Sequence, residues 1–144
     1  MGKTFLKTIL KLAQEKSSLN VVSDQMGTPT SSDLLANVTY NVIKTILKNP
    51  NFKDFGTYHI ALEGETNWYQ YACFINDEAV RLGLKTTMTS QDIKSISSDE
   101  HITAAKRPMN SRLNTTKIKK TFILELPDWK VEAAALLKLT LINT

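Results

Sequence analysis

The apolar and polar residues along the chain follow a pattern that predicts helices separated by short strands. Apolar residues spaced three and four positions apart predict helices over residues 3–16, 32–48, 68–82, 113–120 and 128–141. Short runs rich in β-branched residues predict strands at residues 18–22 and 56–62, and a third strand that begins at Leu84. Residues 94–112 are polar and have no period, so we expect a long irregular loop there.

Residues at the predicted helix ends fit the usual capping chemistry. Ser31 or Ser32 can accept a hydrogen bond from the first turn of the second helix. Thr66 is expected to cap the third helix, and Gly83 follows that helix at the position where a left-handed glycine often ends one. Asp128 is expected to cap the C-terminal helix.

The order of these elements predicts a small mixed α/β fold. Three strands alternate with helices, as in proteins that cover a sheet with helices. A chain of 144 residues has the size of one domain, and a globule of this size buries roughly 68–70% of the surface that its unfolded chain exposes. We therefore treat residues 1–144 as a single domain. Its three strands would make a narrow sheet, which we expect to rest against something larger.

Charge and composition exclude several classes of protein. The net charge of +4 comes from basic residues scattered along the chain, without a recognition motif, so we expect no nucleic-acid partner. Cys73 is the only cysteine, which rules out an intrachain disulfide and fits a reducing, cytoplasmic compartment. No run approaches the roughly 18 apolar residues of a membrane-spanning helix, so we expect no membrane partner.

Tyr40 and Lys44 have the spacing of the tyrosine and lysine that donate and tune a proton in short-chain reductases. That chemistry needs a dinucleotide beside the pair, held by a strand, a glycine-rich turn and a helix N-terminus. The chain has five glycines and no G-x-G-x-x-G sequence. We therefore interpret Tyr40 and Lys44 as neighbours on a helix surface rather than as a catalytic pair.

The turn from Asp24 to Thr30 is a candidate binding segment. Gly27 allows a positive φ, and Pro29 restricts the backbone next to it. Hydroxyl groups then precede the N-terminus of a helix, a place suited to anions. The alternative is a well-capped turn between a strand and a helix, and the sequence leaves both interpretations open.

The loop from Ala104 to Lys117 is a second candidate segment. Arg107 precedes Pro108, which favours a rigid, extended backbone at the arginine. A guanidinium held in this way can bind a phosphate or a carboxylate with two parallel hydrogen bonds. A structural arginine in a salt bridge is the alternative, and it also stays open at this point.

Four blocks, taken together, resemble the C-terminal part of bacterial dTDP-4-dehydrorhamnose reductases. They occur in the right order and spacing from about Gly2 to about Leu137, and they read VVSDQMGTPTSSDLLANVT, GTYHIALEGETNWYQYACFINDEA, AAKRPMNSRLNTTKI and LPDWK. Members of this family are extended short-chain dehydrogenases with a Rossmann domain followed by a smaller substrate-binding domain. The resemblance implies that this chain is the small mixed α/β substrate-binding domain, and it accounts for the narrow sheet.

The resemblance also implies an activity. The family uses NADPH or NADH to reduce dTDP-4-dehydro-6-deoxy-L-mannose to dTDP-L-rhamnose. Its glycine-rich turn, its catalytic tyrosine and lysine, and a tryptophan that stacks on thymine all precede the residue that matches Gly2. We therefore expect the chain to be a truncated reductase without its Rossmann half and inactive alone. The alternatives are a non-catalytic interaction subunit and one half of a split reductase completed in trans.

Site residues are implied only where the family motifs match. The first motif contributes Gln25, Gly27, Thr28, Pro29 and Thr30, and the second, Arg-Pro-x-Asn-Ser, contributes Arg107, Pro108, Asn110 and Ser111. Both imply a position near the dTDP-sugar. Some members hold Mg²⁺ with glutamates at the interface of a homodimer, and Glu15 occupies a matching place on the first helix.

Overall fold

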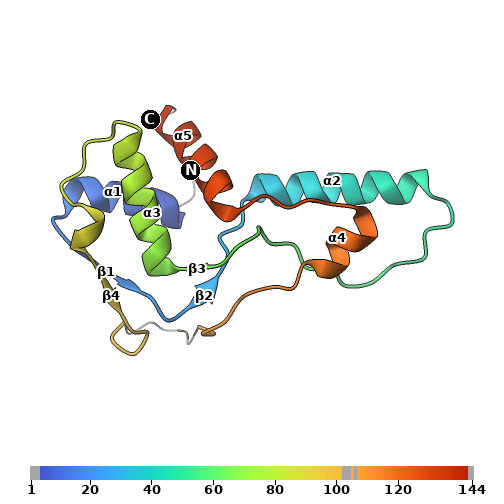
Figure 1. Cartoon of the computed structure of the whole chain (residues 1–144), viewed down its shortest axis with the longest axis horizontal. Coiled ribbons are helices and arrows are strands. Elements are labelled where there is room, and N and C mark those ends of the chain that lie inside the picture. The colour runs from blue at the N-terminus through green and yellow to red at the C-terminus, as the bar shows by residue number, and fades with distance from the viewer. Residues whose placement is uncertain (1–3, 102–104, 106, 143–144) are drawn as a thin grey trace.

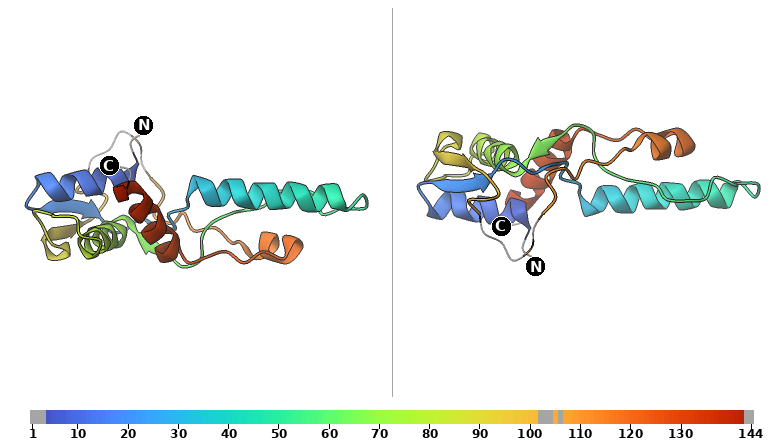
Figure 2. Two further views of the ribbon diagram at one scale, coloured as in Figure 1. Left: turned by 90° about the horizontal axis from the view of Figure 1, so that it is seen from above. Right: turned by 90° about the horizontal axis from the view of Figure 1, so that it is seen from below.

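The computed structural model describes residues 4–101, 105 and 107–142. These residues form a mixed α/β body from which a long arm extends (Figures 1 and 2). The larger helices of the body are α1 (Phe5–Glu15), α3 (Trp68–Arg81) and α5 (Trp129–Ile142), and those of the arm are α2 (Ser32–Lys48) and α4 (Thr116–Phe122). The mixed α/β class predicted from the sequence is confirmed.

The strands form two small sheets instead of the single narrow sheet that the sequence predicts. In the first sheet, β1 (Leu19–Val22) runs parallel to β4 (Ile93–Ile96), with Leu19 opposite Ile93. In the second sheet, β2 (Met26–Gly27) runs antiparallel to β3 (Thr66–Asn67). The third strand therefore lies later than the start at Leu84 that the sequence predicts, after a short 3₁₀ helix, η1 (Ser90–Asp92).

The predicted strand at residues 56–62 is wrong. These residues all lie within the described part of the chain, and they form no strand there. Ala61 and Leu62 are nevertheless buried, because this connection passes over the apolar core before β3 begins. A β-branched and aromatic pattern reports a half-buried surface, and it does not require a hydrogen-bonded neighbour.

The helix ends agree with the capping analysis at most positions. The Ser31 hydroxyl accepts a hydrogen bond from the Leu34 amide at 3.1 Å, so Ser31 rather than Ser32 caps α2. Gly83 follows α3 with a φ of +92°, as expected. The predicted cap at Thr66 is wrong by one residue, because the side chain of Asn67 accepts from the Gln70 amide at 2.8 Å.

The hydrophobic core is built around α3. This helix packs against α1, α5 and the β1–β4 pair, and its residues Ala72, Ile75 and Ala79 are completely buried. An aromatic chain links the helices, because Phe5 stacks on Tyr71 and Tyr71 meets Trp129 edge to face. The body of the protein thus holds most of the buried apolar residues.

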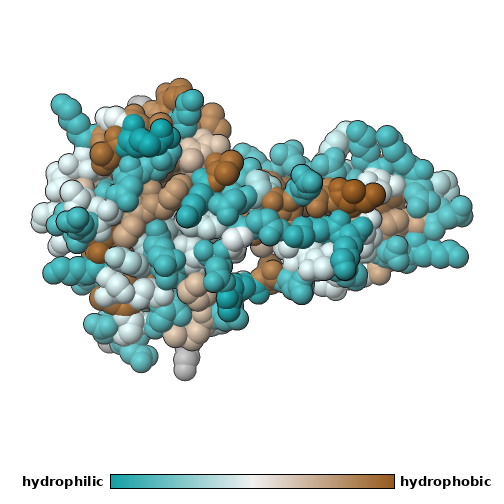
Figure 3. Space-filling model, in the orientation of Figure 1, coloured by the Kyte–Doolittle hydropathy of each residue, from teal (hydrophilic) through white to brown (hydrophobic). Residues whose placement is uncertain are grey.

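The arm has a smaller apolar core, and one side of its helix α2 is exposed to solvent. Helix α2 buries only Leu34 and Val38, although the sequence predicts an apolar stripe along its whole length. Near the tip, Phe122 packs against Phe52 and Tyr58. Apolar side chains remain visible along α2 in the space-filling view (Figure 3). Within the described residues, none of the helices has the length and apolar character needed to cross a membrane.

Candidate functional site

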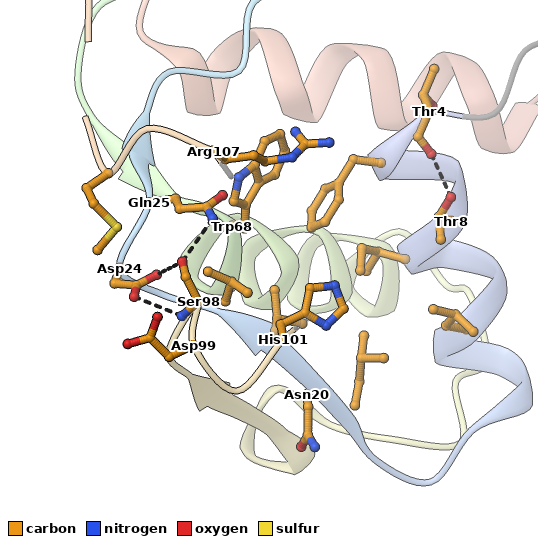
Figure 4. A pocket seen from close by; sticks show the side chains of 17 residues that line it. Thr4, Thr8, Asn20, Asp24, Gln25, Trp68, Ser98, Asp99, His101 and Arg107 are labelled. Carbon is orange, nitrogen blue, oxygen red and sulfur yellow. Dashed lines mark hydrogen bonds between the residues drawn. The ribbon is translucent and has the colours of Figure 1, made fainter. Parts of the chain in front are cut away.

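A cleft of about 840 Å³ runs along β1 between α1 and the segment that follows β4 (Figure 4). One side is apolar and includes Phe5, Ile9 and Leu12 of α1. Polar and aromatic groups lie on the other side, namely Asp24, Gln25, Trp68, Ser98, Asp99, His101 and Arg107. The cleft therefore combines an apolar wall with convergent polar groups, as ligand sites usually do.

A smaller hollow of about 220 Å³ adjoins this cleft, and Gln25, Trp68 and Arg107 line both of them. The hollow brings together the two segments that the sequence singled out. Its lining includes most of the candidate site residues, namely Gln25, Gly27, Thr28, Pro29, Arg107 and Ser111. Two of the candidates, Thr30 and Asn110, do not line either space.

Backbone hydrogen bonds hold the two segments side by side. The amide of Met26 donates to the carbonyl of Met109 at 2.8 Å, and the amide of Ser111 donates to the carbonyl of Met26 at 2.9 Å. Gly27 follows Met26 in β2, and its φ is not positive. The positive φ that a glycine allows is not used here, because β2 pairs with β3 and pairing requires an extended backbone.

The hydroxyl groups of the first segment are used within the fold. Thr28 donates to the carbonyl of Gly64 at 2.9 Å, and Thr30 donates to the carbonyl of Thr28 at 3.2 Å. The Ser31 hydroxyl caps α2 and donates to Glu132 of α5 at 3.2 Å. These contacts favour the well-capped turn over an anion site made of hydroxyl groups.

The two arginines of the second segment have different surroundings. Arg112 forms an ion pair with Glu65 and also donates to the side chain of Asn110 at 2.9 Å. Arg107 forms no ion pair with any carboxylate of the described residues, and it projects into the cleft beside Trp68 (Figure 4). The structural salt bridge is thus made by Arg112, whereas the guanidinium of Arg107 faces the space where a ligand would lie.

Ser98 connects the loop after β4 to the turn after β1. Its amide and hydroxyl donate to the Asp24 carboxylate at 2.8 and 2.6 Å, and Gln25 donates to the same hydroxyl at 2.9 Å. These bonds fix Gln25 at the edge of the cleft. The hydrogen bonds from the Ser98 hydroxyl and amide also lower the pKa of Asp24 below its ordinary value.

This pKa shift predicts how the loop responds to acid. The pKa of Asp24 is lower in the folded state than its ordinary value of 3.8. The ionised carboxylate therefore contributes fully to the stability of the fold above about pH 3.8, and this contribution is lost as the pH falls through the lowered pKa. We expect the amide resonance of Ser98 to move with a midpoint below pH 3.8 in an NMR titration. The Asp24→Asn variant should lack this transition. A midpoint above 3.8 would contradict the contact.

Sequence reasoning missed Trp68 and Ser98 as parts of the site. Trp68 falls in the helix that apolar spacing predicts over residues 68–82, and it lines both hollows at the N-terminus of α3. Its place at the start of that predicted helix was a usable signal, because the N-terminus of a helix is suited to anionic ligands. Ser98 carried no sequence signal, since its role depends on a loop that folds back to Asp24.

Tyr40 and Lys44 lie outside both hollows, on the exposed side of α2. The tyrosine is 62% exposed, and the lysine ammonium lies 5.7 Å from the centre of its ring. The interpretation of these residues as a surface pair is confirmed.

Glu15, the residue matched to a magnesium site, is exposed at the end of α1 and lies 3.8 Å from the ammonium of Lys11. The described residues contain no group of three or more side chains of the metal-binding types. A lone carboxylate does not fit a magnesium site, which needs several oxygen ligands. The role of Glu15 in metal binding stays a prediction.

The described residues also do not form a dinucleotide site. Strand β1 leads into Asp24 and Gln25, whereas a dinucleotide cradle needs a glycine-rich turn that opens a helix. The described residues that line the cleft therefore do not by themselves fit a nicotinamide cofactor.

Comparisons with known proteins place these features in a family. The model of the family described as RmlD substrate binding domain matches residues 1–141. The dTDP-4-dehydrorhamnose reductase of Escherichia coli (strain K12) is 40% identical over 130 residues, which are 90% of this chain and 42% of that protein. The spore coat polysaccharide biosynthesis protein SpsK of Bacillus subtilis (strain 168) is 36% identical over 122 residues, which are 85% of this chain and 38% of that protein.

Solved structures of dTDP-4-dehydrorhamnose reductases resemble the fold of this chain. The dTDP-4-dehydrorhamnose reductase from Bacillus anthracis str. Ames in complex with NADP superposes with a TM-score of 0.76 at 27% identity, over 100% of this chain and 44% of that one. The reductase ortholog from Clostridium acetobutylicum gives a TM-score of 0.78 at 27% identity, over 99% of this chain and 45% of that one. The chain thus spans less than half the length of these relatives. It belongs to the RmlD substrate binding domain family.

Proposed function

We propose that this domain forms one wall of the nucleotide-sugar site of a dTDP-4-dehydrorhamnose reductase. The observation that carries the proposal is the meeting of two distant segments, Gln25–Thr30 and Arg107–Ser111, at one hollow. The relatives with this domain are dTDP-4-dehydrorhamnose reductases, which supports the choice of substrate.

The chemistry of the hollow suits a thymidine diphosphate sugar. Such a molecule carries two charged phosphates, an aromatic base and several hydroxyl groups. Arg107 offers a guanidinium for the diphosphate, and the side-chain amide of Gln25 can donate to or accept from a hydroxyl. Trp68 offers an indole against which a ring can pack. The three side chains lie within one continuous space.

A second domain must supply the hydride. One relative of known structure holds NADP, whereas the described residues of this chain do not form a dinucleotide site. We propose that NADPH or NADH is held by a separate Rossmann domain that closes the cleft from the side of β1. Within that arrangement this chain contributes substrate contacts, and by itself it carries no group that transfers a hydride.

The edge of β1 supports this arrangement. All four residues of β1 line the cleft, although alternate side chains of a strand point to opposite faces of a sheet. The cleft therefore runs along an edge of the strand rather than over one face. Among the described residues β1 pairs only with β4, so its second edge is open to another strand. A cofactor domain with a parallel sheet can extend this edge.

Titration of the isotope-labelled chain with dTDP tests the proposal. We expect amide shifts concentrated at Gly27–Thr30 and Arg107–Ser111. The Arg107→Ala variant should bind dTDP about 10–100-fold more weakly, since a hydrogen bond to a charged group contributes about 1.5–3 kcal/mol. Arg81→Ala is the matched control, because Arg81 is an exposed arginine of α3 that pairs with Glu78 outside the cleft.

Two results would count against a substrate-binding role. A folded chain whose spectrum dTDP leaves unchanged would show that both segments serve only the architecture of the cleft. Equal loss of affinity in Arg107→Ala and Arg81→Ala would show that dTDP responds to general positive charge.

A further inference from the structure

A third hollow, of about 340 Å³, lies between the C-terminal half of α3 and the segment that leads from this helix to β4. The polar residues of its lining are Asn76, Asp77, Thr86, Thr87, Thr89 and Asp92. None of the residues that line it also lines either space of the candidate site. The segment lies at the end of the body that is farthest from the arm (Figure 1). We call this space the Asn76 hollow.

Asn76 presents a buried amide to this hollow. The residue is only 1% exposed, and neither the oxygen nor the nitrogen of its amide has a hydrogen-bond partner among the described residues. Buried polar atoms of side chains nearly always have a partner in folded proteins. Because Asn76 lines the hollow, a molecule bound there can supply both a donor and an acceptor to this amide.

The threonine hydroxyls of the lining are already used within the fold. Thr86 donates to the carbonyl of Met88 at 2.9 Å, and Thr87 donates to the carbonyl of Lys16 at 2.6 Å. The amide of Thr87 also donates to the carbonyl of Ala13 at 2.8 Å. These bonds hold the segment against α1 and keep its place beside α3. A ligand would therefore be recognised by the amide of α3 and by the acidic groups of the lining.

The charge of the lining is negative. Asp77 is exposed on α3 and forms no ion pair with another described residue. The amide and the hydroxyl of Thr89 both donate to one oxygen of Asp92, each at 2.8 Å, and they lower the pKa of this carboxyl. Asp92 is therefore ionised near neutral pH. The described residues that line the hollow include no lysine, arginine or histidine, so the lining favours a positively charged ligand.

We propose that the Asn76 hollow binds a small organic cation, namely an amine whose ammonium group lies close to a hydroxyl or carbonyl oxygen. The ammonium group donates to a carboxylate of the lining and to the amide oxygen of Asn76. The oxygen of the ligand accepts from the amide nitrogen of Asn76. The volume of about 340 Å³ falls within the range of roughly 300–1,000 Å³ that is usual for small-molecule sites.

A metal ion fits the Asn76 hollow less well than an amine. The ion would use the amide oxygen of Asn76 and leave the amide nitrogen without a partner. In the part of the chain that the structure describes, no three side chains of the metal-binding types come together. An amine with a neighbouring oxygen satisfies both atoms of the amide. The site shares no residue with the cleft, so it does not depend on the proposed function.

An NMR titration of the isotope-labelled full chain with ethanolamine tests this site, because ethanolamine carries an ammonium and a hydroxyl group on neighbouring carbons. We expect weak binding, in the millimolar range that suits so small a ligand, with shifts at the side-chain amide of Asn76 and at the backbone amides of residues 86–92. Ethylamine lacks the hydroxyl group and should bind about 3–10-fold more weakly, since one atom of the amide then has no partner. Calcium chloride at the same ionic strength should leave these resonances unchanged.

Three variants separate the site from general charge. Asn76→Leu should weaken the binding of ethanolamine about tenfold or more, and Asp77→Asn should weaken it about 2–5-fold. Asp33→Asn is the matched control, because Asp33 is an exposed aspartate of α2 outside the hollow, and it should bind as the parent chain does. Leucine removes a buried amide that has no partner in the described residues, so a loss of binding in Asn76→Leu will not reflect unfolding.

Three results would overturn the proposal. The first is a spectrum in which ethanolamine leaves the resonances of the Asn76 hollow unchanged. The second is equal binding by the parent chain and by Asn76→Leu, which would mean that the amide takes no part. The third is a response of the same resonances to calcium but not to ethanolamine, which would make the hollow a metal site.

Discussion

Replacing Gly64 with alanine is expected to lower the free energy of unfolding by roughly 2–5 kcal/mol. Gly64 has a φ of +81°, which costs an alanine about 1–2 kcal/mol. A Cβ atom at this position would also lie 2.8 Å from a carboxylate oxygen of Asp128 and 3.0 Å from the indole of Trp129. Trp129 is buried, so it has little freedom to move away.

The contacts around Gly64 connect this loss to the candidate site. The turn is held against the start of α5, because the amide of Trp129 donates to the carbonyl of Glu63 at 3.1 Å. The carbonyl of Gly64 accepts the hydroxyl of Thr28 at 2.9 Å. A shift of this turn is therefore expected to disturb the segment Gln25–Thr30 as well as the core.

Gly83→Ala is the matched control for this variant. Gly83 also has a positive φ, of +92°, but a Cβ atom there would meet nothing within 4 Å. Its loss should be limited to the backbone cost of about 1–2 kcal/mol. Chemical denaturation of both variants measures the difference. Equal losses would show that the contacts with Asp128 and Trp129 relax without cost.

Replacing Asn76 with leucine is expected to raise the free energy of unfolding by about 1–3 kcal/mol. Asn76 lies on α3 and is only 1% exposed. Neither the oxygen nor the nitrogen of its amide has a hydrogen-bond partner among the described residues. The amide therefore loses bonds to water on folding and gains no bond to the described residues in exchange. Leucine has the same branched shape without the polar atoms.

Replacing Asn76 with aspartate is expected to change the free energy of unfolding in the opposite direction. A carboxylate without a partner in this environment is expected to lower the free energy of unfolding by about 3–5 kcal/mol. The two variants together separate polarity from packing, since all three side chains branch at the same carbon. If leucine instead destabilises the protein by more than about 1 kcal/mol, the extra volume of its methyl groups outweighs the removal of the amide.

The helices show how far local sequence determines this fold. Apolar spacing located the α-helices α1 to α5 of the described residues but not the short 3₁₀ helix η1, and Ser31 and Gly83 mark ends that the structure confirms. These signals lie within a few residues of the structure that they predict. The residue that caps α3 is Asn67 and not the predicted Thr66, because Thr66 pairs with Gly27 in the sheet. Capping strength alone does not decide between neighbours when one of them has a tertiary partner.

The strands show where local sequence stops being sufficient. Residues 56–62 have the composition of a strand and form none, whereas Ile93–Ile96 pairs with β1 from within a stretch that seemed irregular. Parallel pairing joins residues far apart in the chain. Which segment takes the place beside β1 depends on the packing of α3 over both strands. No window of a few residues contains that information.

Some features of the candidate site could be predicted from the sequence, and others were decided only by the tertiary structure. The residue types of its two segments, and the resemblance of four sequence blocks to a reductase family, were evident from the sequence alone. The tertiary structure decided that Gln25 and Arg107 share a hollow, that Thr28 and Arg112 serve the fold, and that Trp68 joins the lining. Local sequence specifies helices and their ends because the hydrogen bonds of a helix span four residues. A cleft depends on contacts between segments far apart in the chain, so only the packed structure shows which side chains face it.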